Sequence, residues 1–325
     1  MTNLLEISDL RVRYQITPPL KALLNPSQPA FVDAVAGVDL FLEAGKTYAL
    51  VGESGSGKST LARAVNGLVP AGSESSIRLD NIELTTLSAS EFRSQRRNMV
   101  MMFQDPIGSL SPRCTVQTLL KEPFQAHGLI ERDLDAECRR LLSLVGLPSS
   151  FADRYPHQLS GGQARRVGLA RAVALDPRLI IADEPTAGLD VSIQGEVLNL
   201  LNSLQDRLGL TILIITHNLH VVRHIAHRVG IMYLGRLVEE GFAEEIFDAP
   251  RHPYTKALLS ASYTPDANAD RIELKGEAPS LRNRPKGCEF HTRCPFEREK
   301  CRLEAPPIGA ASTHNHRYSC FFPLS

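Results

Sequence analysis

The fold of this chain follows from one stretch, Gly52-Glu53-Ser54-Gly55-Ser56-Gly57-Lys58-Ser59-Thr60. It fits the pattern G-x-x-x-x-G-K-[ST], in which glycines let the backbone curl so that its N–H groups point at phosphate. The apolar run 47–51 predicts a buried strand before it, and residues 58–67 predict a helix after it. The helix N-terminus adds positive partial charge. A glycine-rich turn that binds nothing is the alternative, and the flanking strand and helix disfavour it.

Within this stretch, two side chains have specific expected roles. Lys58 should reach the β and γ phosphates of a nucleotide, and the Ser59 hydroxyl should bind Mg²⁺. The base could stack on Tyr14, at the end of a predicted strand over 4–14, or on Phe31, which begins another. A core or strand-face tyrosine is the equal alternative for Tyr14. The residues assigned to the phosphate site are Gly52, Glu53, Ser54, Gly55, Ser56, Gly57, Lys58, Ser59 and Thr60.

The composition is that of a soluble globular protein. The length of 325 residues suggests about two domains. Lysine plus arginine and aspartate plus glutamate are both 36, and the formal net charge of +0 argues against a nucleic-acid-binding surface. The longest apolar runs, such as 212–215, are far shorter than the roughly 18 residues that span a bilayer. We therefore expect any membrane role to need separate membrane subunits. Four prolines in 17–30 predict a surface insertion.

Polar residues follow three predicted strands. Gln104 directly follows the predicted strand over 98–103 and could contact a metal ion or a water molecule at a phosphate site. Asp183 and Glu184 end an apolar strand, where Asp183 would hold Mg²⁺ through its water shell and Glu184 would polarise the attacking water. His217 follows another strand and could contact the γ-phosphate. Solvated acids and a structural histidine are the alternatives for isolated residues of these types.

A second glycine pair lies between a helical block and a further helix. The block over 115–157 interrupts the strand-rich frame and predicts a helical subdomain, in which Cys138 belongs to the apolar face of a helix. Ser160 occupies a helix N-cap position, and the glycines that follow predict another anion-binding element. The residues assigned to this element are Ser160, Gly161, Gly162 and Gln163.

These motifs occur in the order seen in ABC-type ATPases, which the chain resembles over about residues 4–245. By that resemblance Gln104 is the Q-loop, L-S-G-G-Q over 159–163 the signature, and His217 the switch histidine. Asp190 ends the D-loop A-G-L-D, where many members have S-A-L-D. The resemblance implies ATP and Mg²⁺ as cofactors. It also implies an α/β fold: a P-loop NTPase (RecA-like) core, an antiparallel β lobe, a helical subdomain inserted at about 105–165 and a small C-terminal cysteine-bearing extension.

The C-terminal part resembles the ATPases of dipeptide and oligopeptide importers. H-P-Y-T at 252–255, Q-D-P-I-G-S-L-S-P-R at 104–113 and R-Y-P-H-Q-L-S-G-G-Q at 154–163 carry this likeness. It implies a nucleotide-binding domain over 1–250 and an importer-type extension over 251–325. The implied activity is ATP hydrolysis that powers solute import, with peptides as the first expectation and opines, sugars or nickel chelates left open.

The resemblance also implies partners. Two nucleotide domains face head to tail, and each ATP lies between one P-loop and the partner's signature. We expect a second ATPase subunit, two membrane permeases and an external solute-binding protein, with no nucleic acid, at the cytoplasmic face of the bacterial cell membrane. A groove near Gln104 should receive a coupling helix. The alternatives are a soluble ABC ATPase in nucleic-acid repair, translation or iron–sulfur assembly, and a structural subunit without turnover. The tail and the intact Glu184 and His217 disfavour them.

Four cysteines gather near the C-terminus in the pattern C-x5-C-x6-C-x18-C, at Cys288, Cys294, Cys301 and Cys320. Disulfides are disfavoured in a reducing cytosol. Zinc sites usually have tighter C-x₂₋₄-C pairs, whereas a [4Fe–4S] cluster needs four cysteines and tolerates this spacing. The family resemblance also implies a cluster, since some importer ATPases carry one here. Zinc and four unliganded thiols are the alternatives.

Overall fold

The computed structural model describes residues 2–16, 31–102, 108–263, 272, 274, 276–310 and 316–325. They form two compact units, each assembled from separate stretches of chain. The first, here called the helical unit, comprises Met1–Leu4, Leu42–Thr47 and Thr86–Ile215. The second, here called the P-loop unit, comprises Leu5–Phe41, Tyr48–Thr85 and Thr216–Ser325. The proline-rich insertion expected at 17–30 lies outside the described residues.

Three parallel strands form the sheet of the helical unit, in the order β8-β7-β6. They are β6 (Met99–Met102), β7 (Leu179–Asp183) and β8 (Thr211–Thr216). Every residue of β7 and β8 is buried, as expected for parallel strands covered on both faces. Parallel strands end at a common edge, so the carboxyl ends of β6, β7 and β8 lie at the same edge of this sheet.

The predicted helical block is confirmed. Cys138 is 2% exposed on α5 beside the buried Leu141 and Leu142, because these residues recur at helical spacing on one apolar face. The helices of this unit are α3 (Ala89–Gln95), α4 (Val116–Ala126), α5 (Leu134–Leu144), η1 (Ser149–Phe151), η2 (Pro156–Gln158), α6 (Gly161–Ala172) and α7 (Val191–Leu208).

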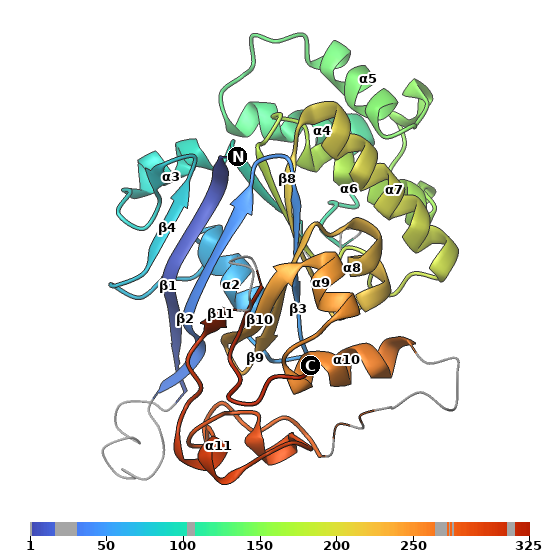
Figure 1. Cartoon of the computed structure of the whole chain (residues 1–325). Helices are drawn as coiled ribbons and strands as arrows, with labels where there is room; N and C mark the ends of the chain where they lie inside the picture. Colours follow the sequence, from blue (N-terminus) through green and yellow to red (C-terminus); the bar gives the residue numbers. More distant parts are fainter. Residues whose placement is uncertain are drawn as a thin grey trace. The chain divides into compact units, whose positions relative to one another are not determined.

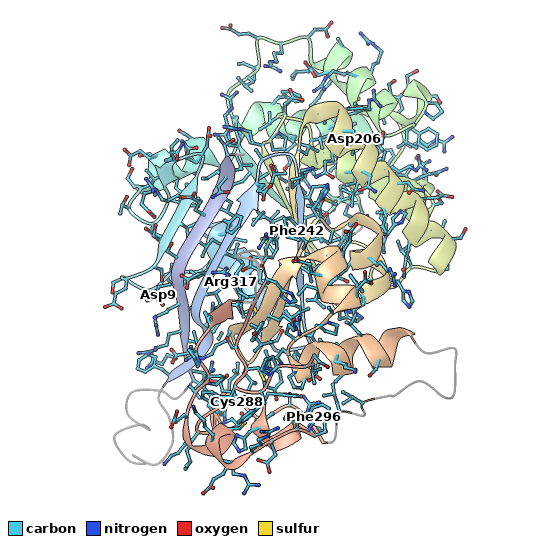
Figure 2. All side chains as sticks on the ribbon, in the orientation of Figure 1. Asp9, Asp206, Phe242, Cys288, Phe296 and Arg317 are labelled. Atoms are coloured by element: carbon cyan, nitrogen blue, oxygen red, sulfur yellow. The ribbon has the colours of Figure 1, made fainter. Side chains whose placement is uncertain are left out.

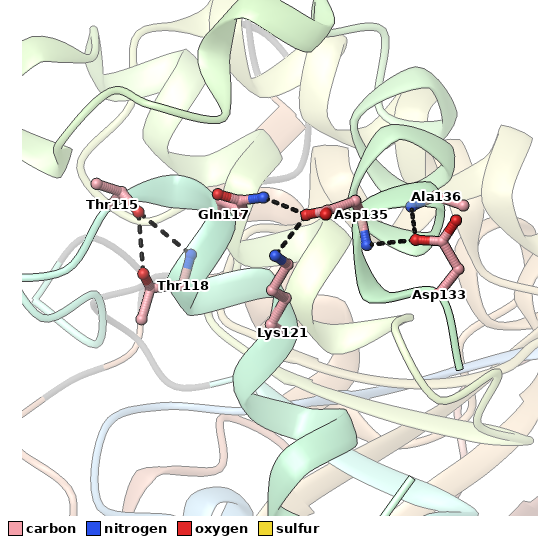
Figure 3. A network of polar contacts seen from close by, with 7 residues as sticks. All are labelled: Thr115, Gln117, Thr118, Lys121, Asp133, Asp135 and Ala136. Carbon is pink, nitrogen blue, oxygen red and sulfur yellow. Dashed lines mark hydrogen bonds and ion pairs between the residues drawn. The ribbon is translucent and has the colours of Figure 1, made fainter. Parts of the chain in front are cut away.

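Polar contacts join the starts of α4 and α5 (Figure 3). The carboxylate of Asp135, in the first turn of α5, accepts hydrogen bonds from Gln117 and Lys121 of α4, both at 2.5 Å. The hydrogen bond and charge of Lys121 lower the pKa of Asp135. Asp133 caps α5 by accepting from the backbone N–H of Asp135 at 3.0 Å, and Thr115 caps α4. The contacts of Asp135 link the first turn of α5 to α4.

The P-loop unit contains the expected antiparallel β lobe (Figure 1). Its strands run in the order β2-β1-β4-β5, and β4 pairs antiparallel with both β1 and β5. The prediction of strands over 4–14 and 31–42 is confirmed within one residue at each end. The bounds are β1 (Asn3–Gln15), β2 (Phe31–Glu43), β4 (Ser76–Leu79) and β5 (Ile82–Glu83).

The same unit holds a second set of strands, in the order β11-β12-β10-β9-β3. β3 pairs parallel with β9, and β9, β10, β12 and β11 pair antiparallel in turn. The strands are β3 (Thr47–Val51), β9 (Arg228–Tyr233), β10 (Arg236–Phe242), β11 (Gly309–Ala310) and β12 (Arg317–Tyr318). The helices of the P-loop unit are α2 (Lys58–Val65), α8 (Leu219–Ile225), α9 (Ala243–Asp248), α10 (Pro253–Tyr263), η3 (His291–Arg293) and α11 (Glu299–Leu303). In the described ranges, no helix is both long and apolar enough to cross a bilayer.

Candidate functional site

The P-loop lies between β3 and α2, as the sequence predicts. Gly57 caps α2 in the left-handed conformation at φ 101°. A Cβ atom there would lie 2.3 Å from the carbonyl oxygen of Ala34, and one at Gly52 would lie 2.2 Å from that of Met232. Both distances are far below a normal van der Waals contact with backbone. Only glycine therefore fits at these two positions, and the loop is packed closely against β2 and β9.

The Lys58 side chain lies over the loop that precedes it and is 7% exposed. Its ammonium donates to the carbonyl oxygens of Gly52 at 2.8 Å and Glu53 at 2.9 Å, and to the Ser56 hydroxyl at 3.2 Å. The positive charge is thus held against the loop at the N-terminus of α2, where the helix adds positive partial charge. This arrangement suits an incoming phosphate.

A cavity of about 360 Å³ borders the P-loop. Its walls include Glu53–Ser56, Val32 of β2 and Ile16 just beyond β1, together with residues 278–282 from the C-terminal part of the chain. The two candidate aromatics do not line it: Tyr14 is 37% exposed, and Phe31, 50% exposed, has the guanidinium of Arg13 6.0 Å from its ring centroid. The choice between them as the base-stacking residue stays a prediction.

In the helical unit, β7 ends at the two acids that the sequence singled out. Asp183 is 6% exposed, and Glu184 adopts a left-handed backbone at φ 50°. The Glu184 N–H donates to the Ile215 carbonyl at 2.8 Å, which holds this uncommon conformation in place. Non-glycine residues in this region carry backbone strain and cluster at functional sites. His217 directly follows β8 and is exposed; Gln104 lies outside the described residues.

The signature forms the expected capped helix start. Ser160 is the N-cap of α6; its hydroxyl accepts from the Gln163 N–H at 3.3 Å, and the Gln163 side chain accepts from the Ser160 N–H at 3.0 Å. This reciprocal capping box confirms the predicted N-cap. Ser160 and Gly161 are exposed, so the start of α6 is available to a partner molecule.

Arg165 joins the signature helix to the loop after the acidic pair, a link that sequence reasoning missed. Its guanidinium donates to the carbonyl oxygens of Pro185 at 3.0 Å and Ala187 at 3.1 Å while the side chain is buried. No signal in the sequence marks this link, because the two acceptors lie 20 and 22 residues further along the chain. The same loop ends at Asp190, which caps α7 by accepting from the Ile193 N–H at 3.0 Å.

A second cavity, of about 460 Å³, lies in the helical unit. Residues of α4, including Glu122 and His127, line it with Met101 and Met102 of β6. Arg171 of α6, also in its wall, donates to Glu122 at 2.8 Å and to the Ser109 carbonyl at 3.1 Å. The strand that ends just before Gln104 therefore forms part of a cavity that the helical subdomain also lines.

The four C-terminal cysteines are brought together. Cys288, Cys294, Cys301 and Cys320 line one cavity, here called the cysteine cavity, whose wall includes Phe290 and Phe296. Figure 2 shows Cys288 and Phe296 in the same C-terminal part of the chain.

Burial raises the pKa of the cysteine-cavity thiols: of Cys288, of Cys294 to about 12, and of Cys320 to about 11. Among the described residues, no group of three or more His, Cys, Asp or Glu side chains is arranged so as to hold a metal ion.

Sequence reasoning also missed two residues that contact the P-loop from far along the chain. The Tyr254 hydroxyl accepts a hydrogen bond from the Glu53 N–H at 3.0 Å, and Arg293 pairs with the Glu53 carboxylate. Tyr254 belongs to the H-P-Y-T segment, which carries the likeness to importer ATPases. The segment itself is the signal that could have pointed to a structural role.

Comparison with family models matches two separate parts of the chain. Residues 35–187 match the model described as "ABC transporter". Residues 238–301 match the model described as "Oligopeptide/dipeptide transporter, C-terminal region". The second match begins in β10 and extends to Cys301, so it covers three of the four cysteines.

Curated proteins similar to the chain match it over nearly its full length. The Oligopeptide transport ATP-binding protein AppF of Bacillus subtilis (strain 168) is 44% identical, covering 98% of this chain and 97% of its own. The Oligopeptide transport ATP-binding protein OppF of Salmonella typhimurium is 43% identical, covering 98% and 95%.

Solved structures of related cassettes share the fold. The cbiO1 protein from Clostridium perfringens, part of the ABC transporter complex cbiONQ, has a TM-score of 0.64 at 28% identity, covering 76% of this chain and 91% of its own. The dimeric post-hydrolysis state of the ATP-binding cassette MJ0796, bound to ADP and Pi, has a TM-score of 0.61 at 26% identity, covering 74% and 98%.

Proposed function

The chain belongs to the ABC transporter ATPases, among the ATP-binding subunits of oligopeptide and dipeptide transporters, and we infer that it hydrolyses ATP to power oligopeptide import. The observation that carries this inference is the likeness beyond the nucleotide-binding part. Residues 238–301 match the C-terminal region of oligopeptide and dipeptide transporters, which a soluble ABC ATPase of nucleic-acid repair or iron–sulfur assembly would not need. The same likeness favours peptides over opines, sugars or nickel chelates.

The P-loop supplies the phosphate-binding part of the proposed nucleotide site. Lys58 would leave the carbonyl oxygens of Gly52 and Glu53 for the β and γ phosphates, an exchange of neutral acceptors for charged ones. Ser59 and the buried Asp183 are the proposed Mg²⁺ residues, and the metal would offset phosphate charge.

The catalytic roles go to residues at strand ends. Glu184 would orient and polarise the attacking water, and its strained backbone supports a functional position. His217 and Gln104 would contact the γ-phosphate and the metal, and Tyr14 or Phe31 would stack on the base. Asp190 of the D-loop completes the set, and its cap on α7 gives it a defined orientation.

ATP would be bound between two nucleotide-binding subunits. The exposed Ser160 and Gly161 at the start of α6 support this, because a signature that serves only its own chain has no need of exposure. A related cassette has been solved as a dimer with ADP and Pi. In the proposed cycle ATP closes the dimer and hydrolysis opens it, so the γ-phosphate biases a two-state element. We take the partner to be a second, different ATPase subunit.

The cavity of the helical unit is the proposed docking site for a coupling helix of a membrane permease. It combines apolar residues such as Met101 and Met102 with the ion pair of Arg171 and Glu122, a mixture suited to an amphipathic helix. Two permeases and an external peptide-binding protein would complete the transporter, placing the chain at the cytoplasmic face of the cell membrane. The division into 1–250 and 251–325 belongs to the same proposal.

A [4Fe–4S] cluster is the proposed occupant of the cysteine cavity. Four cysteines share its wall, the number that a [4Fe–4S] cluster needs, and aromatic residues line it as well. Bound as thiolates, Cys288, Cys294 and Cys320 would lose the protons that burial now favours. Such a cluster would make the extension sensitive to redox conditions and would cross-link it. It would take no part in ATP hydrolysis, because that reaction needs no electron transfer.

The test of the transport function starts from the native cell. The tagged chain should sediment with membranes and co-purify in detergent with two permeases and a second ATPase. In vesicles, this complex should hydrolyse ATP several-fold faster when an oligopeptide-loaded binding protein is added, and a Glu184→Gln complex should not respond. A chain that stays in the supernatant, with ATPase activity stimulated by nucleic acid, would instead support the soluble alternative.

A further inference from the structure

Glu53, the second residue of the P-loop, is held at three points. Its carboxylate accepts hydrogen bonds from both terminal nitrogens of Arg293, at 2.9 and 3.1 Å. Its backbone N–H donates to the Tyr254 hydroxyl at 3.0 Å. Its carbonyl accepts from the Lys58 ammonium at 2.9 Å. The peptide that holds the phosphate-binding lysine is therefore itself held by residues 201 and 240 positions further along the chain.

The pair of Arg293 and Glu53 differs from an ordinary surface ion pair. The Arg293 side chain is 7% exposed and that of Glu53 26%. The guanidinium meets the carboxylate with two parallel hydrogen bonds, a geometry that fixes orientation as well as distance. Exposed ion pairs with a single contact contribute little to stability, because water and salt screen them. The pair of Arg293 and Glu53 is mostly shielded from water and has two contacts. The pair can therefore keep the loop in one position.

The groups that hold Glu53 are rigidly mounted. Tyr254 is fully buried, and its ring packs 4.7 Å from Tyr233 and 5.3 Å from Phe290, between centroids. Phe290 meets Tyr233 edge to face at 5.4 Å, the geometry that aromatic pairs prefer. Phe290 and Arg293 lie between Cys288 and Cys294, which line the cysteine cavity. The cysteine-bearing segment thus reaches the P-loop through its own aromatic and charged side chains.

We propose that Arg293 and Tyr254 are positioning residues for ATP binding, which fix Glu53 and with it the backbone conformation of the phosphate-binding loop. This inference rests on the proposed nucleotide function of the P-loop. A loop already held in its binding conformation loses less conformational freedom when the ligand arrives. The contribution should therefore appear mainly in ATP affinity and KM, with kcat changed much less, because the held geometry serves ground state and transition state alike.

The test measures the affinity of the purified full chain for the fluorescent nucleotide methylanthraniloyl-ATP with Mg²⁺. Arg293→Met, which keeps length and apolar contact but removes the charge, should raise the dissociation constant about tenfold. Arg293→Lys keeps the charge without the paired hydrogen bonds and should recover part of the loss. Tyr254→Phe removes only the hydroxyl and should raise the constant roughly threefold. In the assembled complex, these variants should raise KM and change kcat much less.

A double-mutant cycle and a matched control make the test specific. Glu53→Gln should weaken binding about as much as Arg293→Met, and the double variant should be no worse than either, because they remove one shared interaction. Arg302→Met removes another arginine–carboxylate pair of the same extension, whose partner is Glu297, and should leave affinity unchanged. Thermal unfolding without nucleotide establishes that each variant is folded.

Two outcomes separate this inference from the function on which it rests. If the wild-type chain fails to bind the nucleotide, the proposed function is wrong. If it binds and Arg293→Met binds equally well, or if the losses in the double variant simply add, Arg293 does not position the loop. Should Arg293→Met fail to fold, Arg293→Lys and Tyr254→Phe decide, since Arg293→Lys keeps the charge and Tyr254→Phe keeps the ring, and unchanged affinity in both would overturn the proposal.

Discussion

Replacing Gly57 with alanine should destabilise the nucleotide-free chain by about 2–5 kcal/mol. The residue adopts φ 101°, and its added Cβ would lie 2.3 Å from the Ala34 carbonyl oxygen on β2. A left-handed backbone costs an L-residue about 1–2 kcal/mol. Moving a packed backbone to relieve the clash costs about 1–3 kcal/mol more. The two contributions add because one is intrinsic to alanine and the other comes from the neighbouring strand.

Gly55 provides a matched control within the same loop. It too is left-handed, at φ 77°, but a Cβ there meets nothing within 4 Å. Gly55→Ala should therefore cost only the conformational part, about 1–2 kcal/mol. The difference between the two variants isolates the packing of the P-loop against β2.

The assay is urea denaturation followed by far-UV circular dichroism, because the chain has no tryptophan to report by fluorescence. Nucleotide is left out so that binding does not add to stability. The midpoint should fall for both variants, and further for Gly57→Ala, at an unchanged slope. Equal midpoints for the two variants would refute the claim that the β2 carbonyl confines the loop to glycine at position 57.

Three further outcomes follow from the site. Lys58→Ala should weaken MgATP binding on the order of a hundredfold through loss of charge-assisted bonds to phosphate, and titration with a fluorescent ATP would show it; wild-type hydrolysis by this variant would disprove the P-loop assignment. Glu184→Gln should bind ATP normally yet hydrolyse it about 10²–10⁴ times more slowly, measured in a complex whose partner ATPase is silenced; unchanged turnover there would remove Glu184 from catalysis. Anaerobically purified protein should absorb broadly near ~400 nm and hold about four irons per chain; colourless protein with one zinc or no metal would exclude the cluster.

Local features of the chain were predicted well because their causes are local. The strand over 47–51 and the start of α2 at Lys58 follow from an apolar run, a set of glycines and a helix-forming segment that are adjacent in sequence. The cap at Ser160 follows from a four-residue pattern. Cys138 was placed in a core because its helix repeats apolar residues on one face.

Long-range contacts could not be predicted in the same way. Nothing near Glu53 in sequence points to Tyr254 or Arg293, since only the fold brings them together. In the sequence, Arg165 is one of several arginines on α6. Its two acceptors, the carbonyl oxygens of Pro185 and Ala187, come within reach only when the chain after β7 has folded back towards α6. The residue that stacks on the nucleotide base, Tyr14 or Phe31, could not be identified for a related reason. The answer depends on which of the two side chains a bound base would contact.

The distance along the chain between Glu53 and Arg293 has a consequence for biosynthesis. The ribosome adds about 5–20 residues per second, so the 240 residues between them take on the order of 12–48 s to make. Once β9 has been made, a nascent chain can form β3 and α2, yet its phosphate loop still lacks the contacts of Tyr254 and Arg293. Nucleotide reaching a ribosome-bound intermediate would meet a looser loop than in the released protein. If Arg293 and Tyr254 position the loop as proposed, completion of the C-terminal segment sets the time at which the subunit first binds ATP tightly.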